Sequence, residues 1–174
     1  AGGKSQAASD AACALWHLQD PCAELDYDIG DEIAEVGANV TDWKVGDRVL
    51  IDPRDRQGAG LFGETVDGGL AEYARVPTHQ LVPLPGNVSF ADAASLPVAY
   101  GTAHRMMVTR GEVTAEDKVL ILGASGGVGT GALLLAKIIG AQVVACGSSQ
   151  AKLDALTEMG ADHVIDYTEV DFVR

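Results

Sequence analysis

Two regions of the chain differ in the period of their hydrophobic positions. Between Asp31 and Val82, short apolar runs are separated by glycine, proline and aspartate, a pattern that predicts short antiparallel strands. The strands are expected at residues 32–36, 49–51, 70–76 and 81–84. A turn at Gly46-Asp47 precedes the second of them, and Pro53 ends it because proline cannot donate to a sheet ladder.

From Lys118 the pattern becomes one of apolar strands alternating with amphipathic helices. Strands are expected at 118–122, 142–146 and 163–167, with helices at 127–139 and 150–159. This alternation predicts the first half of a doubly wound parallel sheet. Before it, Ser89 and Asp92 form a capping-box pattern for a helix that Pro97 and Gly101 should interrupt.

Residues 119–136 carry no charge, which is the length at which a membrane helix becomes possible. Five glycines lie within this segment, mostly near its middle, and they favour a strand, a tight turn and a buried helix instead. No secretory signal pattern precedes it. We therefore expect no membrane segment.

The overall charge and the cysteines narrow the function classes. A formal net charge of −13 disfavours nucleic acid and anionic membranes as partners, because both would be repelled. Three cysteines (Cys13, Cys22 and Cys146) give no disulfide framework, which is typical of a reducing cytoplasm.

A glycine-rich turn follows the strand at 118–122, which is apolar enough to be covered on both faces. The sequence Ala124-x-Gly126-x-x-Gly129 lies between this strand and an apolar helix, the context that a dinucleotide-binding fingerprint requires. Its first glycine is replaced by alanine. The backbone of Ser125, Gly126, Gly127 and Val128 is the candidate pyrophosphate site. The alternative is a glycine turn used only for packing.

The end of the next strand indicates which dinucleotide is bound. An acid there would bind the ribose hydroxyls of NAD, but none occurs before Asp154. Ser148, Ser149 and Lys152 could instead hold a 2′-phosphate, so NADP(H) is favoured over NAD(H). In the alternative interpretation, the serines cap the following helix and Lys152 is merely solvated.

The chain resembles the medium-chain dehydrogenase/reductase superfamily over residues 32–174, and its zinc-free quinone-reductase-like members more than the zinc alcohol dehydrogenases. The motifs that carry the resemblance are Val45-Gly46-Asp47-Arg48-Val49, Gly69-Leu70-Ala71-Glu72-Tyr73, Ala93-Ala94-Ser95-Leu96-Pro97, Gly101-Thr102-Ala103, the glycine turn, and Gly160-Ala161-Asp162-His163-Val164-Ile165-Asp166-Tyr167.

The resemblance implies an α/β protein with a GroES-like β-barrel domain at 1–112, followed by a partial Rossmann doubly wound parallel sheet at 113–174. It places Thr102 near the nicotinamide. It matches Ser148, Lys152 and Tyr167 to positions that contact the adenosine 2′-phosphate. Thr102 could instead bond only to its own helix, and Tyr167 could be an ordinary strand aromatic.

The N-terminal segment departs from the family pattern. Trp16 stands where alcohol dehydrogenases carry a zinc-ligand cysteine, and residues 26–28 replace the Gly-His-Glu motif. The loop at 52–63 lacks the four thiolates of a structural zinc site, and Cys13, His17 and Cys22 are the only nearby ligand candidates for a catalytic one. We therefore expect no zinc.

These observations predict a zinc-independent, NADP(H)-dependent oxidoreductase that transfers a hydride to a small-molecule quinone, enal or related carbonyl compound. Two alternatives stay open: a zinc alcohol dehydrogenase whose ligands are missing here, and a non-catalytic cofactor-binding protein of this fold. The resemblance also implies a homo-oligomer. Since a complete doubly wound sheet needs further strands, the chain is expected to be a fragment. Ser125 lacks the Gly-x-Ser-x-Gly context of a hydrolase nucleophile.

Overall fold

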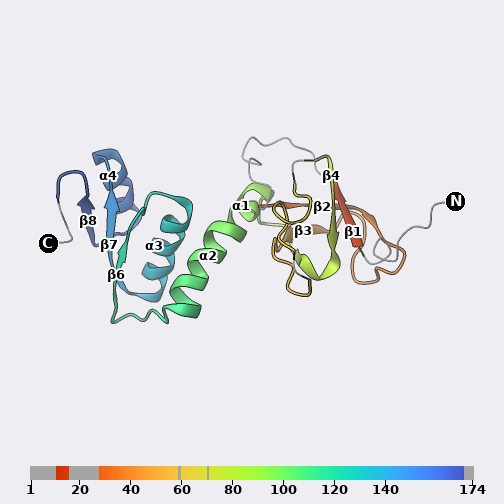
Figure 1. Ribbon diagram of the computed structural model, residues 1–174, viewed down its shortest axis with the longest axis horizontal. Coiled ribbons are helices and arrows are strands. Elements are labelled where there is room, and N and C mark those ends of the chain that lie inside the picture. The colour runs from red at the N-terminus through yellow and green to blue at the C-terminus, as the bar shows by residue number, and fades with distance from the viewer. Residues whose placement is uncertain (1–10, 16–27, 59, 70, 171–174) are drawn as a thin grey trace. The chain divides into compact units, whose positions relative to one another are not determined.

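The chain forms two compact units, 1–98 and 99–174 (Figure 1). The computed structural model describes residues 11–15, 28–58, 60–69 and 71–170, and for residues 11–15 it describes the backbone alone. The units divide earlier in the chain than the predicted domain boundary at 112. The helical residues that follow Val98 therefore pack within the second unit.

The first unit is built on a five-stranded antiparallel sheet with the order β4-β1-β2-β3-β5. Its strands are β1 (Ala11–Leu15), β2 (Gly30–Val36), β3 (Arg48–Ile51), β4 (Tyr73–Pro77) and β5 (Leu81–Pro83). Alternate residues of β3 and β4 point into the core, so Val49, Ile51 and Val76 are fully buried. The predicted turns and short strands are present here, with their bounds shifted by a few residues.

Helical turns run from Phe90 to Arg110, and the predicted capping box begins them. The Ser89 hydroxyl accepts the N–H of Asp92 at 3.0 Å and starts α1 (Phe90–Ala94). After a turn come η3 (Leu96–Tyr100), α2 (Gly101–His104) and η4 (Arg105–Arg110), of which η3 and η4 are π-helical.

The predicted interruption at Pro97 and Gly101 takes the form of a change in helix type: α1 ends at Ala94, residues 96–100 are π-helical, and α-helical geometry resumes at Gly101. Pro97 lies in the first turn of η3, where its missing N–H removes no helical bond, and Gly101 begins α2. The helical turns therefore continue through both residues.

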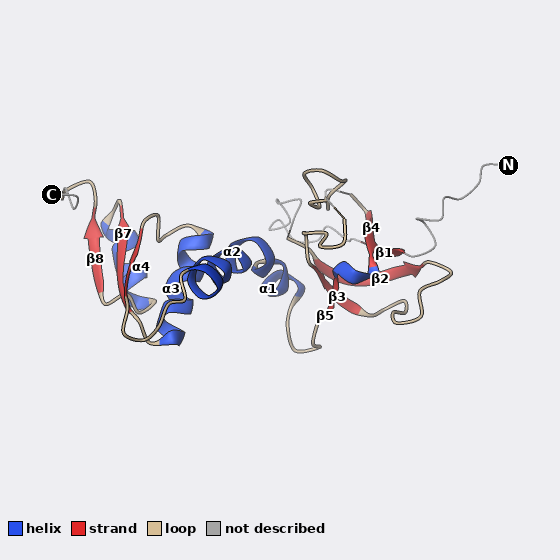
Figure 2. Cartoon of the chain, turned by 60° about the horizontal axis from the view of Figure 1, so that its bottom comes forward, coloured by secondary structure: helices blue, strands red, loops and turns tan. Residues whose placement is uncertain are grey.

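The second unit holds a three-stranded parallel sheet with the order β6-β7-β8 (Figure 1), of which Figure 2 gives a second view. Its elements are β6 (Lys118–Ile121), α3 (Gly127–Ile139), β7 (Gln142–Gly147), α4 (Gln150–Glu158) and β8 (His163–Asp166). The predicted βαβαβ order is confirmed. Leu133 of α3 and Leu156 of α4 pack in one core with Val143 of β7.

One face of β6 differs from the prediction that this strand is covered on both faces. Leu120 is 51% exposed, and Leu122, which directly follows the strand, is 63% exposed, so within the described residues β6 is not covered on both faces. Parallel crossovers are right-handed as a rule, which places α3 and α4 on the same side of the sheet.

The uncharged segment at 119–136 forms β6, the glycine turn and most of α3. Among the described residues, no helix combines the length and the apolar character needed to cross a membrane.

A partly exposed network ties α3 to β7 and to Asp162, the residue before β8. The Asp162 Oδ2 atom accepts the Lys137 ammonium at 2.8 Å and the N–H of Val143 at 2.7 Å. Lys137 and this amide hold the pKa of Asp162 below its ordinary value. A carboxyl with a lowered folded-state pKa stabilises the fold above its unfolded pKa of about 3.9, and this contribution is lost as the pH falls through the folded-state value.

Asp162→Asn is therefore expected to lower the urea midpoint of unfolding at pH 7, because the uncharged amide loses the Lys137 ion pair. The difference from wild type should shrink as the pH falls from about 5 to 2. Urea unfolding across that pH range measures this, with Glu158→Gln, an exposed acid of α4, as the matched control. A difference that stays constant with pH would contradict the prediction.

Candidate functional site: a glycine turn and a Ser–Lys pair

The chain reverses direction between β6 and α3 through a tight glycine turn. Gly123 has φ +62°, a left-handed conformation that glycine adopts without strain. The N–H of Gly126 donates to the Gly123 carbonyl oxygen at 3.0 Å and closes the turn. Ala124, which replaces the first fingerprint glycine, is fully buried and has no positive φ. The backbone conformation at this position therefore does not require glycine.

Three backbone amides at the start of α3 have no partner among the described residues. The first helical bond runs from the Thr130 N–H to the Gly126 carbonyl oxygen at 2.8 Å, so the N–H groups of Gly127, Val128 and Gly129 precede the hydrogen-bonded turns. Gly126, at the N-cap, brings no side chain to bond them. The amides and the helix dipole together suit a diphosphate.

The glycines of this turn play different parts. A Cβ on Gly129 would lie 2.7 Å from the Cα of Ala124, so any side chain there would force the helix off the strand. A Cβ on Gly126 would meet only the Gly123 carbonyl oxygen, at 3.5 Å. Gly126 and Gly127 are exposed, as is Ser125, whose hydroxyl has no partner within the described part of the chain. Gly129 thus serves packing, and Gly126 leaves the backbone open.

The predicted phosphate-binding side chains gather where β7 ends. The Lys152 ammonium donates to the Ser148 hydroxyl oxygen at 3.2 Å, which places a cation and a hydroxyl together at the start of α4. Ser149 occupies the N-cap of α4, but its side chain accepts no capping bond. The Ser149 hydroxyl therefore does not cap α4, and the role of both serines in phosphate binding stays a prediction.

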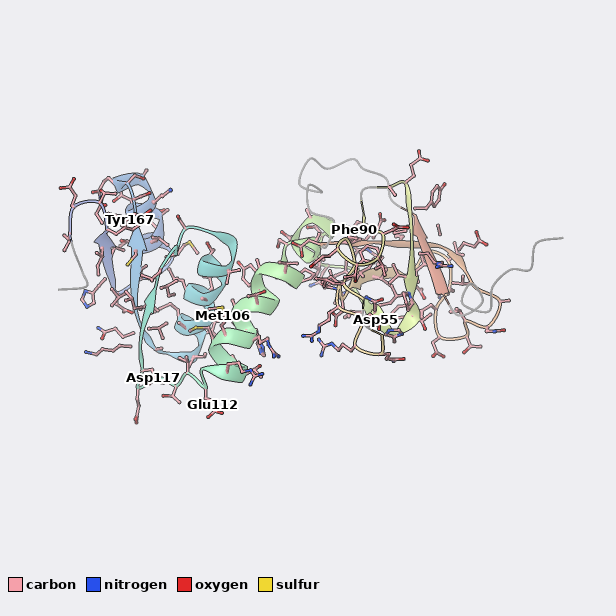
Figure 3. All side chains as sticks on the ribbon, viewed as in Figure 1. Asp55, Phe90, Met106, Glu112, Asp117 and Tyr167 are labelled. Carbon is pink, nitrogen blue, oxygen red and sulfur yellow. The ribbon has the colours of Figure 1, made fainter. Side chains whose placement is uncertain are left out.

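Tyr167 lies beside the same strand end. Its N–H donates to the Gly147 carbonyl oxygen at 3.2 Å, and its side chain is 49% exposed rather than packed. Figure 3 shows Tyr167 and Asp117 at opposite ends of the parallel sheet. Ser148, Lys152 and Tyr167 are thus at the carboxyl ends of the strands, where doubly wound sheets bind ligands.

An acid that the sequence analysis did not weigh lies at this edge. Asp166 ends β8 opposite Gly147, and its Oδ1 atom accepts the Thr168 hydroxyl at 2.6 Å and the Thr168 N–H at 2.9 Å. These two bonds hold the pKa of Asp166 below its ordinary value. The Asp-x-Thr spacing is the signal that predicts such a local turn.

Thr102 is exposed on α2, and its hydroxyl has no partner in the residues that the structure describes. The Thr157 hydroxyl, by contrast, donates to the Leu153 carbonyl oxygen at 2.9 Å in the manner of a helix-bonded threonine. Thr102 is therefore available to a ligand, and α2 lies alongside α3, the helix that begins at the glycine turn (Figures 1 and 2).

The candidate zinc ligands are only partly within the described structure. Trp16, His17 and Cys22 lie outside the described residues, and Cys13 lies on β1, whose side chains are not described. In the described part, no three histidine, cysteine or acidic side chains gather as metal ligands. Cys146 is buried, and burial raises the pKa of its thiol, which disfavours the thiolate that binds metals. The expectation of no zinc stays a prediction.

Comparisons with known proteins point to one family. Residues 10–86 match the alcohol dehydrogenase GroES-like domain, and residues 127–174 match a model described as zinc-binding dehydrogenase. Over 144 residues the chain is 40% identical to an Arabidopsis thaliana protein named NADPH-dependent alkenal/one oxidoreductase, chloroplastic. Over 146 residues it is 32% identical to a Pongo abelii quinone oxidoreductase.

These alignments cover 82% and 84% of this chain but only 36% and 41% of the two relatives. Among solved structures, that of AibC superposes with a TM-score of 0.80 and 32% identity, covering 94% of this chain and 55% of the other.

Proposed function

Because the chain belongs to the medium-chain dehydrogenase/reductase superfamily, we propose that its second unit binds NADPH for the reduction of an enal or a quinone. The observation that carries the proposal is the row of bare amides at Gly127, Val128 and Gly129, in the same unit as the Ser148–Lys152 pair. The first suits a diphosphate and the second a ribose phosphate.

The proposed binding mode assigns a separate task to each group. The amides of Gly127 and Val128 hold the diphosphate, and the open backbone at Ser125 and Gly126 lets it approach. Lys152, together with the hydroxyls of Ser148 and Ser149, binds the 2′-phosphate. Tyr167 covers the adenosine end with an exposed ring.

The chemistry divides between cofactor and protein. NADPH supplies the hydride when bound. The Thr102 hydroxyl is proposed to orient the nicotinamide end by a hydrogen bond, since it is exposed and unpartnered among described residues. Without a metal, the protein's contribution is positioning and hydrogen bonding. Enals and quinones are the proposed acceptors because relatives carry those names.

The test measures binding and turnover separately. The fluorescence of NADPH titrated with the purified protein should be enhanced, and NADH should compete weakly. NADPH oxidation with trans-2-hexenal and 1,4-benzoquinone should then exceed the rate without protein. No fluorescence enhancement at about 1 mM, the upper end of ordinary KM values, would refute the proposal. If the protein binds NADPH but reduces neither acceptor, the proposal that it is an enzyme is refuted, and it is a non-catalytic cofactor-binding protein.

Thr102→Val is expected to lower kcat about tenfold while the Kd for NADPH stays within twofold of wild type. Valine keeps the shape of threonine but loses the hydroxyl, and one hydrogen bond at the reacting end is worth about 1.4 kcal/mol. Steady-state kinetics with trans-2-hexenal measure this. Thr109→Val, an exposed threonine of η4, is the matched control and should change neither constant. An unchanged kcat in the Thr102 variant would exclude the assigned role.

A further inference from the structure

The first unit contains a cavity of about 550 Å³. Its lining residues come from the loop at 55–66, from the end of β4 and from η2 (Thr78–Gln80), a short 3₁₀ helix that follows β4. Sites for small molecules usually have volumes of about 300–1,000 Å³. None of the lining residues is among the groups proposed to bind NADPH, so the cavity is a candidate for a second binding site.

Hydrogen bonds hold the walls of the cavity in place. The N–H of Phe62 donates to the Pro53 carbonyl oxygen at 2.8 Å and folds the loop back on itself. The N–H of Asp52 donates to the Gln80 carbonyl oxygen at 2.8 Å, and the Gln80 side-chain Nε2 donates to the Asp52 carbonyl oxygen at 2.8 Å. These bonds tie the loop to η2 without a ligand, so the cavity is already formed.

The acid in the cavity wall is fully engaged by the protein. Asp55 lies in the loop (Figure 3), and its Oδ1 atom accepts the N–H groups of Gly58 at 2.7 Å and Gln57 at 2.9 Å. The His79 Nε2 atom lies 2.8 Å from the same oxygen and donates to it. The Gly58 amide, His79 and the Gln57 amide hold the pKa of Asp55 below its ordinary value. Its negative charge is therefore largely compensated before a ligand enters.

Two other lining residues keep unused hydrogen-bonding groups. Arg75, on β4, forms no ion pair or hydrogen bond through its guanidinium with any residue that the structure describes. Gln80 is only 4% exposed, and because its Nε2 donates to Asp52, its Oε1 is an acceptor. This oxygen receives no donor from the described residues, although buried polar atoms are nearly always paired. The cavity thus offers a cation and a buried acceptor.

The remaining wall is partly apolar, since Phe62 and Val66 also line the cavity. We propose that this cavity binds a small hydroxylated carboxylate. The carboxylate pairs with the Arg75 guanidinium, whose planar fork suits it, and the hydroxyl donates to the Gln80 Oε1 atom. The hydrocarbon body of the ligand packs against Phe62 and Val66.

Three probes of similar size test the class of ligand. Isothermal titration calorimetry on the full chain without NADPH should give a Kd of about 1 mM or lower for 4-hydroxybenzoate. Benzoate lacks the hydroxyl and phenol lacks the carboxylate, so each should bind at least about fivefold more weakly. No heat of binding for 4-hydroxybenzoate at about 10 mM would overturn the proposal. It would be overturned as well if benzoate or phenol bound as tightly as 4-hydroxybenzoate.

Arg75→Ala tests whether the probe binds in this cavity. The variant should weaken the binding of 4-hydroxybenzoate about 10-fold or more, because it removes the cation that pairs with the carboxylate. Arg110→Ala, which removes an exposed arginine of η4 in the second unit, is the matched control and should stay within about twofold of wild type. Equal losses in the two variants would show a general effect of charge and overturn the proposal.

Val66→Phe tests the same location by filling space. Val66 is 52% exposed, so a larger side chain there should narrow the cavity and leave the thermal midpoint unchanged. The affinity for 4-hydroxybenzoate should fall about 10-fold. If the folded variant binds the probe as tightly as wild type, the ligand does not occupy this cavity. Because these titrations contain no NADPH, their outcome is independent of the proposed function, and the failure of either proposal leaves the other standing.

Discussion

Gly126→Val is expected to weaken NADPH binding about 100-fold or more while the protein stays folded. Gly126 has φ −88° and ψ 167°, an extended conformation that valine readily adopts. A side chain there would stand at the N-cap of α3, next to the bare amides that the diphosphate needs. Losing two hydrogen bonds to a charged group costs about 3 kcal/mol, which corresponds to roughly 100-fold in Kd.

The control for this variant is Gly86→Val, because a Cβ on Gly86 would meet no atom within 4 Å and Gly86 lies in the first unit. NADPH fluorescence titration and the thermal midpoint should be measured on both variants. Gly129 is no substitute for Gly126 in this test: a Cβ there would lie 2.7 Å from the Ala124 backbone and disturb folding itself. If the Gly126 variant is folded and binds NADPH as tightly as wild type, the diphosphate does not bind at this turn.

The sequence predicted the second unit well because its signals are local. The start of α3 follows from the glycines, and its end at Ile139 follows from Gly140, whose φ of +96° terminates the helix. The bounds of β7 and β8 were each predicted to within one residue, since glycine or aspartate turns flank them. The side chains placed at the strand ends also followed from order alone, because parallel strands end at one edge.

What the sequence did not predict depends on residues far apart in the chain. Pro97 and Gly101 look like helix breakers, yet helical turns continue there because the Tyr100 ring and Ala103 pack against α3. The apolar pattern of β6 resembles that of a doubly covered strand, but only tertiary packing decides which face is covered, and Leu120 is exposed. The spacing of apolar residues indicates whether a segment is a helix or a strand, but it does not show which other elements pack against that segment.

The candidate site shows the same division. The glycine turn could be located by motif and context, whereas the bond between Lys152 and Ser148 depends on the geometry of α4 and could not be predicted from the sequence. Asp166 was missed as a site neighbour because it follows the third strand, and its proximity to Gly147 arises from sheet register. Side-chain pairing is a property of the folded chain.

Lys152→Ala is expected to weaken NADPH binding about 10- to 100-fold and to leave NADH binding within about threefold. The two cofactors differ only in the 2′-phosphate, so a loss confined to NADPH reports contact with that group. A charge-assisted hydrogen bond to a phosphate has the required strength. Lys152 already points toward the Ser148 hydroxyl, so the cation is held near the proposed phosphate position before binding.

Lys118→Ala is the matched control, because it removes the same charge from the first residue of β6, at the other end of the sheet. It should change neither affinity by more than about twofold, which separates a local contact from the effect of making an acidic protein more acidic. Raising the salt concentration should weaken NADPH binding more in wild type than in the Lys152 variant. Salt screens the ion pair between Lys152 and the 2′-phosphate, which only the wild type forms. Equal losses for NADPH and NADH would instead mean that Lys152 supports the shape of α4, and the 2′-phosphate would need a different partner.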